Sequence, residues 1–130
     1  MSGALVLDSD GLSQFILRTA AAKKWRAVAE ARNLDVVTSA ATLVEARDPK
    51  TPQSAFDHAL SRIMVKPITE NIARAASKLL AAENLHGHKY AIDAMVAATA
   101  HEEYGEVTVV TSDVDDLTRL CLPRIAIEHV

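Results

Sequence analysis

Cysteine, glycine and proline are all scarce in this 130-residue sequence, and aromatic residues make up only 4% of it. The single cysteine, Cys121, excludes an internal disulfide and a cysteine-rich zinc site. The four glycines are scattered, so no glycine-rich loop is available to cradle a phosphate. No apolar run approaches the roughly 20 residues that span a bilayer, and no basic region precedes the first apolar run. We therefore expect a cytoplasmic protein without a signal peptide or a membrane partner.

A net excess of positive charge is also missing, because 17 acidic residues outnumber 14 basic ones and the net charge is −3. The chain as a whole should not attract nucleic acid. Locally the balance reverses, since five basic residues lie between positions 18 and 32: Arg18, Lys23, Lys24, Arg26 and Arg32. A solvated helix face is the ordinary interpretation of such a segment, and a protein-binding surface is the alternative.

Apolar and polar residues alternate in a pattern that predicts strands and helices in turn along one domain, residues 1–130. The expected strands are 5–7, 34–38, 63–65, 107–110 and 123–127. The expected helices are 9–18, 20–32, a short one capped by Ser39 that carries Glu45, then 52–61, 70–84, 90–100 and 113–120. This alternation demands parallel pairing through right-handed crossovers. The predicted fold class is α/β, a three-layer sandwich with a parallel four- to five-stranded sheet flanked by helices.

Two acidic residues directly follow expected strands: Asp8 closes the run 4–7, and Asp113 closes the run 107–112. Ligands of open α/β sheets gather beyond the carboxyl ends of the strands, where these two side chains should lie. Asp8 could itself cap the helix that follows, but Ser9 and Asp10 are both available for that role, which would leave Asp8 free to face a ligand. Asp10 itself is either a further ligand or only a cap.

The segment 111–116 contains three acids at the amino end of an expected helix. The helix macrodipole favours negative charge there, which accounts for two of them without any further function. Asp113 is nearest the strand end and is the best candidate ligand. Asp116, one turn further along, is an additional candidate, whereas Asp115 should face solvent.

Asp93 interrupts an otherwise apolar helix. Burying a carboxylate costs several kcal/mol unless a partner compensates the charge. An ion pair with Lys89, one turn earlier, is the simplest alternative, but such a pair contributes only about 0.3–0.5 kcal/mol when exposed. That gain would not justify burial, so Asp93 should have a stronger partner.

Glu45 has a weaker case, because the sequence 42–45 also fits a capping box formed by Thr42 and Glu45. The argument for a functional role of Glu45 is its position. It lies within two turns of a strand end, on a helix that should turn Leu43 and Val44 to the core. Carboxylates that converge on one site repel one another unless cations neutralise them. Oxygen-only sites suit Mg²⁺ or Mn²⁺, and phosphodiester hydrolysis is the reaction that this chemistry fits best.

Four segments resemble, in order and spacing, the motifs of PIN domains, and most closely those of VapC-type toxins of bacterial toxin–antitoxin pairs. They are Leu5-Val6-Leu7-Asp8, residues 38–46 around Glu45, residues 92–100 around Asp93, and residues 110–117 with Thr111-Ser112-Asp113 and Asp116. The resemblance implies a Mg²⁺- or Mn²⁺-dependent endoribonuclease in which an activated water attacks the RNA phosphate, leaving a 5′-phosphate and a 3′-hydroxyl.

The same resemblance implies a role for each residue. The catalytic acids would be Asp8, Glu45, Asp93 and Asp113, and the ligands of one or two metal ions would be Asp8, Asp93, Asp113 and Asp116. Ser9, Thr111 and Ser112 would orient the substrate or a carboxylate. The implied partners are an RNA substrate, a cognate antitoxin and a second copy of the chain in a homodimer, with the first two helices as candidates for the dimer or antitoxin surface.

Two other interpretations remain open. Residues 7–12 also resemble the DxDG signature of haloacid dehalogenase-like phosphatases, in which Asp8 would be the nucleophile and Asp10 the acid. That interpretation leaves Asp93 without a role and finds no lysine in a convincing context. A non-catalytic PIN-like interaction module is the third possibility, and the presence of all four principal acids argues against it.

Overall fold

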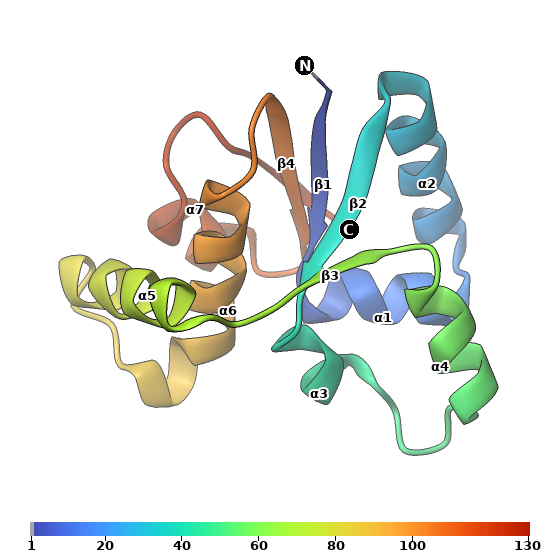
Figure 1. The fold of residues 1–130 in the computed structure, drawn as a ribbon, viewed down its shortest axis with the longest axis horizontal. Helices are drawn as coiled ribbons and strands as arrows, with labels where there is room; N and C mark the ends of the chain where they lie inside the picture. Colours follow the sequence, from blue (N-terminus) through green and yellow to red (C-terminus); the bar gives the residue numbers. More distant parts are fainter. Residues whose placement is uncertain (1) are drawn as a thin grey trace.

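The computed structural model describes residues 2–130, and its centre is a five-stranded sheet (Figure 1). All strand pairs are parallel and the spatial order is β3-β2-β1-β4-β5. The strands are β1 (Gly3–Leu7), β2 (Leu34–Ser39), β3 (Met64–Lys66), β4 (Glu106–Thr111) and β5 (Ala126–His129). The predicted parallel sheet is confirmed.

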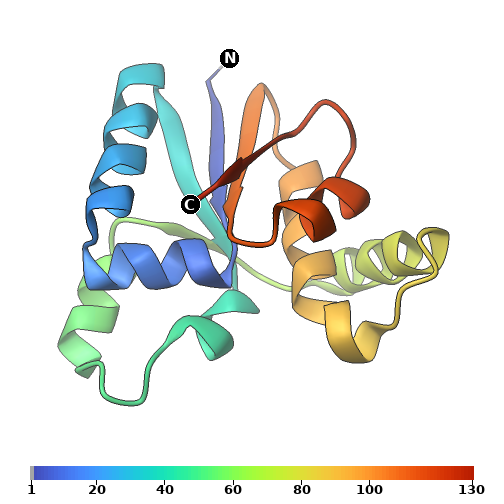
Figure 2. The same ribbon diagram turned by 180° about the vertical axis from the view of Figure 1, so that it is seen from behind.

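Helices cover both faces of the sheet, which confirms the expected three layers (Figures 1 and 2). Helices α1 (Ser9–Leu17), α2 (Ala20–Arg32) and α4 (Gln53–Leu60) lie on one face. Helices α6 (Gly87–His101) and α7 (Val114–Leu120) lie on the other, and α5 (Glu70–Ala82) packs on the outer side of α6. The one-turn helix α3 (Thr42–Ala46) follows β2. Among residues 2–130, no helix combines the length and apolar character that crossing a membrane requires.

The central strand β1 shows how alternation builds the two cores. Leu5 and Leu7 point into the core shared with α1 and α2, whereas Ala4 and Val6 point into the core shared with α6 and α7. Each of these side chains is at most 2% exposed. A strand that is buried on both faces must be apolar at every position, which is why 4–7 reads as a continuous apolar run.

The register of the sheet aligns the ends of its middle strands. Leu7 of β1 pairs with Thr38 of β2 and with Val110 of β4. The residues that follow these positions therefore meet at one edge of the sheet. Asp8 directly follows β1, and Asp113 lies two residues beyond the end of β4.

Several expected boundaries were wrong, and the expected helix 90–100, for example, begins at Gly87 and ends at His101. Ser39 does not cap α3: it is the last residue of β2, and its hydroxyl accepts a hydrogen bond from the Ala41 backbone N–H in a turn. The last strand is 126–129 instead of 123–127, because the segment from Leu122 forms a turn closed by the Ile125 N–H to the Leu122 carbonyl. The third strand lies one residue later than expected, at 64–66.

Candidate metal centre

Asp8 is the most buried acid of the site, with 3% of its surface exposed. Its Oδ1 accepts a hydrogen bond from the Gly11 backbone N–H at 2.8 Å, so Asp8 caps α1. The expectation that Ser9 or Asp10 would do so was wrong, because those residues already lie inside the helix. A Cβ at Gly11 would lie 2.9 Å from the Val110 carbonyl oxygen and 3.4 Å from Asp8 Oδ1. Glycine thus allows the first turn of α1 to approach both β4 and the carboxylate.

The loop after β4 is tied to Asp8 through Thr111. The buried Thr111 hydroxyl donates to Asp8 Oδ2 at 2.5 Å and accepts from the Asp113 backbone N–H at 2.8 Å. A second link joins the two loops, since the Ser112 hydroxyl hydrogen-bonds to the Asp10 carboxylate. These bonds use the hydroxyl groups as connectors between acids that are far apart in the sequence. They hold the start of α1 and the start of α7 together.

Five carboxylates meet in two overlapping groups. Oxygen atoms of Asp8, Asp10 and Asp113 lie within 4.8 Å of one another, as do those of Asp93, Asp113 and Asp116. Asp113 belongs to both groups. Asp10, for which the sequence left two roles open, therefore joins the acids and does not cap the helix.

Among residues 2–130, no basic side chain forms an ion pair with these acids. The ion pairs found among residues 2–130 involve other acids: Glu106 with Arg32, Glu70 with Arg74, and Glu83 with Arg119. Lys89, the alternative partner of Asp93, instead places its amine 5.1 Å from the centroid of the Tyr90 ring. The ion pair that would have explained Asp93 without a ligand does not form.

The pKa values reflect this crowding. Burial, followed by the negative charges of Asp113 and Asp8, raises the pKa of Asp93 to about 7. Burial also raises the pKa of Asp8, against the opposing effect of its hydrogen bonds, and the pKa of Asp113, whose next contributors are Asp10 and Asp116. Without a cation, Asp93 thus keeps its proton up to a higher pH than an ordinary carboxyl group does.

Glu45 lies outside both groups of acids. It is exposed on α3, yet its negative charge contributes to the raised pKa of Asp93 and of Asp113, so it faces the same site. The expectation that Val44 would pack into the core was wrong, because 86% of its surface is exposed. The capping box with Thr42 does not form either, since α3 has no side-chain cap.

A buried network of hydroxyl groups places α3, and the sequence analysis missed it. Thr38 donates to the Leu7 carbonyl at 2.8 Å, and its hydroxyl lies 2.6 Å from that of Thr42. Thr42 in turn donates to the Ser39 carbonyl at 2.8 Å. All three residues are fully buried. The available signal was three hydroxyl residues within one turn of the end of a buried strand.

The remaining predicted residues lie at or beside the acids. Ser9 is 7% exposed, and its hydroxyl has no hydrogen-bond partner within residues 2–130. Buried polar groups in folded proteins are almost always paired, so an unpaired one beside a cluster of acids is unusual. Asp115 is exposed and belongs to neither acid group, as expected.

These observations define a class of protein. It is a parallel α/β protein with a centre made only of oxygen donors, located beyond the carboxyl ends of β1 and β4. Carboxylates without histidine or cysteine suit small, hard divalent cations such as Mg²⁺ and Mn²⁺. The uncompensated charge and the raised pKa values show that the residues present fit such an ion.

Comparison with known families identifies the family. The PIN domain family model matches residues 5–121, so the chain belongs to the PIN domain family. This assignment confirms the resemblance to PIN domains.

Two solved structures share the fold. One is "VapBC2 from Rickettsia felis bound to a DNA fragment from their promoter", with 18% sequence identity, a TM-score of 0.69 and 98% of each chain covered. The other is "FitAB bound to IR36 DNA fragment", with 24% identity, a TM-score of 0.58, and 96% of this chain and 94% of that chain covered. Comparison with curated proteins gave no match.

Proposed function

We propose that the protein is a Mg²⁺- or Mn²⁺-dependent endoribonuclease whose single domain is residues 1–130. One observation carries this proposal. Two clusters of three carboxylates share Asp113, and none of these acids forms an ion pair with a basic residue among the described residues. A site of this kind retains too much negative charge to bind RNA by itself. It becomes complementary to a phosphodiester only when divalent cations lie between the acids and the phosphate.

In this proposal four acids hold one or two ions: Asp8, Asp93, Asp113 and Asp116. The chemistry that such an ion supplies when bound is neutralisation of phosphate charge and a lowered pKa of a coordinated water. Thr111 keeps Asp8 oriented through its 2.5 Å hydrogen bond and keeps the backbone of Asp113 in place. The arrangement of the ligands is therefore built before an ion binds.

The remaining residues act on water and substrate. Glu45, exposed at the rim of the site, accepts a proton from a water that approaches the phosphate. The unpaired hydroxyl of Ser9 donates to a water or a phosphate oxygen in the site. Ser112 orients Asp10 through the hydrogen bond between them. Attack on the phosphorus with departure of the 3′ oxygen leaves a 5′-phosphate and a 3′-hydroxyl.

The proposal extends to the biological setting. We place the protein as the cytoplasmic toxin of a toxin–antitoxin pair, acting as a homodimer and held inactive by its cognate antitoxin. Support comes from the motifs that resemble VapC-type toxins and from the fold shared with chains of the VapBC2 and FitAB structures. Sequencing the ends of cleaved RNA from cells that express the protein without its neighbour-encoded inhibitor would identify the substrate.

The decisive test compares Asp93→Asn with Asp115→Asn. Purified proteins are incubated with structured RNAs and Mn²⁺, and the products are separated on a denaturing gel. We expect Asp93→Asn to lose at least a hundredfold in cleavage rate because it removes a ligand, and Asp115→Asn, exposed on the same helix as Asp116, to cleave like wild type. Cleavage that persists unchanged in Asp93→Asn refutes the assignment. Absence of cleavage by the wild type supports the non-catalytic module instead.

A further inference from the structure

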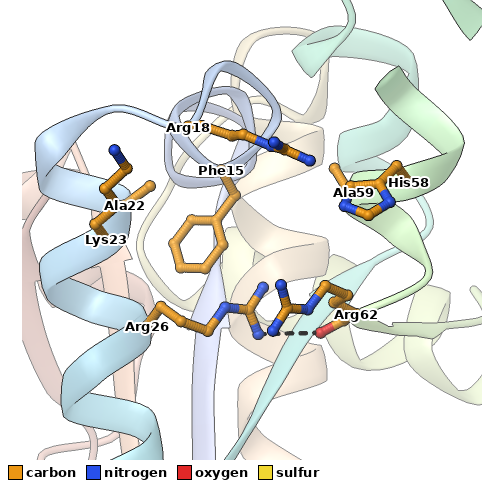
Figure 3. A pocket seen from close by; sticks show the side chains of 8 residues that line it. All are labelled: Phe15, Arg18, Ala22, Lys23, Arg26, His58, Ala59 and Arg62. Carbon is orange, nitrogen blue, oxygen red and sulfur yellow. Dashed lines mark hydrogen bonds between the residues drawn. The ribbon is translucent and has the colours of Figure 1, made fainter. Parts of the chain in front are cut away.

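A second region of unbalanced charge lies away from the acids, in a cavity of about 450 Å³ between α1, α2 and α4 (Figure 3). The Phe15 ring lines the cavity. Four basic residues line it as well: Arg18, Lys23, Arg26 and Arg62. His58 also lines the cavity, and none of its lining residues is acidic. The cavity combines an apolar wall with a ring of cations.

Nothing within residues 2–130 neutralises these four cations by an ion pair, because the ion pairs found there use Arg32, Arg74 and Arg119. Glu30, on the same helix as Arg26, is the acid that acts on the Arg26 guanidinium from a distance. Unpaired cations around one cavity attract an anion, even though exposed like charges repel one another only weakly in water. The charge pattern therefore indicates an anionic ligand.

One of the arginines, Arg26, is held in position. The Arg26 guanidinium lies 5.1 Å from the centroid of the Phe15 ring and donates to the Arg62 carbonyl oxygen at 3.2 Å. Figure 3 shows the two guanidinium groups side by side at one end of the cavity. A guanidinium that is already oriented loses little side-chain entropy when it binds an anion, and its fork of donors matches a phosphate.

The position of the cavity relative to the acids identifies the anion. Helix α1 begins beside Asp8, at the centre of the molecule, and ends beside Arg18, where α2 and α4 approach it (Figures 1 and 2). Its nine residues span about 14 Å, the reach of a few nucleotides. A ligand that is cut at the acids and anchored at the cavity must be a continuous polyanion. A nucleic acid strand meets this condition, whereas a single phosphate or one acidic side chain does not.

We propose that this cavity is a subsite for the phosphates of single-stranded RNA, a few nucleotides away from the bond that is cleaved. This inference rests on the proposed nuclease function. Five carboxylates repel RNA from the catalytic centre, and the net charge of −3 offers no compensation elsewhere. The cationic cavity supplies the missing attraction, with affinity from phosphates and little dependence on sequence.

The test measures RNA binding separately from cleavage. Fluorescein-labelled oligouridylates of about 4 and 12 nucleotides are titrated, by fluorescence anisotropy, against Asp93→Asn protein that also carries Arg26→Gln and Arg62→Gln. At about 0.1 M salt we expect the 12-mer to bind about tenfold more weakly and the slope of log Kd against log salt to fall by about 1.4. The 4-mer is long enough to occupy the cavity and should bind more weakly as well. Arg74→Gln, which removes a charge from α5, is the matched control and should change nothing.

A second pair of substitutions guards against misfolding. Arg26 is half-buried, so Arg18→Gln with Lys23→Gln, both exposed, provides an independent variant that keeps the core intact. The subsite is overturned if both folded double variants bind the 12-mer as tightly as the parent protein does. It is also overturned if Arg74→Gln weakens 12-mer binding by the same factor. Loss of poly-glutamate peptide binding with RNA binding retained also overturns it, in favour of an acidic protein segment as the occupant.

The same measurements separate this inference from the proposed function. Wild-type cleavage of RNA together with unchanged 12-mer binding in the variants refutes the subsite alone. Weaker 12-mer binding in the variants, without any cleavage by the wild type, supports the subsite and refutes the nuclease.

Discussion

Helix α1 connects two regions of opposite charge that differ in almost every physical respect. The acids at its start are brought together from three separate segments, and Asp8 is almost completely buried. The cations near its end come from residues 18–62, and three of them are exposed. Exposed like charges repel weakly in water, whereas buried ones interact strongly because the local dielectric constant is low. The acidic region should therefore depend on a bound cation, and the basic region should persist without a ligand.

The affinity for a divalent metal ion should show the largest difference between the acidic and the basic region. We expect Mn²⁺ affinity to fall by about two orders of magnitude in Asp8→Ala and in Asp113→Ala, because each removes a charged oxygen ligand. Isothermal titration calorimetry of the folded proteins measures it. Arg18→Gln, in the basic region, should bind Mn²⁺ like wild type. Equal affinity in the two aspartate variants would remove the argument for a metal centre.

The two regions should also differ in how stability depends on pH. In the metal-free protein the pKa of Asp93 is raised to about 7 from an ordinary value of 3.8. Between these two pKa values the folded state retains a proton that the unfolded state releases, so the stabilising contribution of Asp93 is full below about pH 4 and is lost as the pH rises through about 7. Thermal denaturation in EDTA should give a Tm several degrees lower at pH 8 than at pH 5.

Variants and metal sharpen this pH test. Asp93→Asn should flatten the decline and Mg²⁺ at pH 8 should reverse it, because either change removes the uncompensated charge. Arg18→Gln should leave the decline as it is in wild type. A metal-free wild type whose Tm does not fall between pH 5 and pH 8 would show that the acids are solvated in spite of their crowding.

A smaller effect should follow from Thr111→Val, which keeps the size of the side chain and removes its hydroxyl group. Asp8 Oδ2 and the Asp113 N–H lose their partner, and we expect a loss of about 1–3 kcal/mol in the free energy of unfolding. Urea denaturation at pH 5, where repulsion between the acids is weaker, measures this loss. Thr118→Val on α7 is the control, since its exposed hydroxyl bonds only to the Val114 carbonyl. Equal losses in the two variants would mean that Thr111 has no special role.

Much of the fold could be predicted from local patterns. The apolar run 4–7 and the alternation of strands with helices were sufficient for a parallel sheet, because strands buried on both faces need helices on both sides. Boundaries were less secure where a polar residue had two possible partners. Ser39 was expected to begin a helix, but its hydroxyl stabilises a turn at the end of β2.

The acids of the candidate site could be predicted from the sequence, but the hydrogen bonds that join them could not. Asp8, Asp93 and Asp113 were notable because each ends or interrupts an apolar segment, which is a property of the chain alone. The capping of α1 by Asp8 was only one of the alternatives, since Ser9 and Asp10 are equally good caps by residue type. The hydrogen bond between Asp10 and Ser112 joins residues from opposite ends of the chain, and no local pattern reveals it.

The sequence by itself determined the order of elements, the parallel sheet and the presence of acids that a buried environment could not tolerate alone. Those features depend on residue type and short-range spacing, which act through burial of apolar surface and the cost of burying charge. Only the tertiary structure decided which acids lie close together, that Glu45 lies outside both groups, and that four cations surround one cavity. Electrostatic interactions depend on distances between side chains, and the fold alone sets those distances for residues remote in the chain.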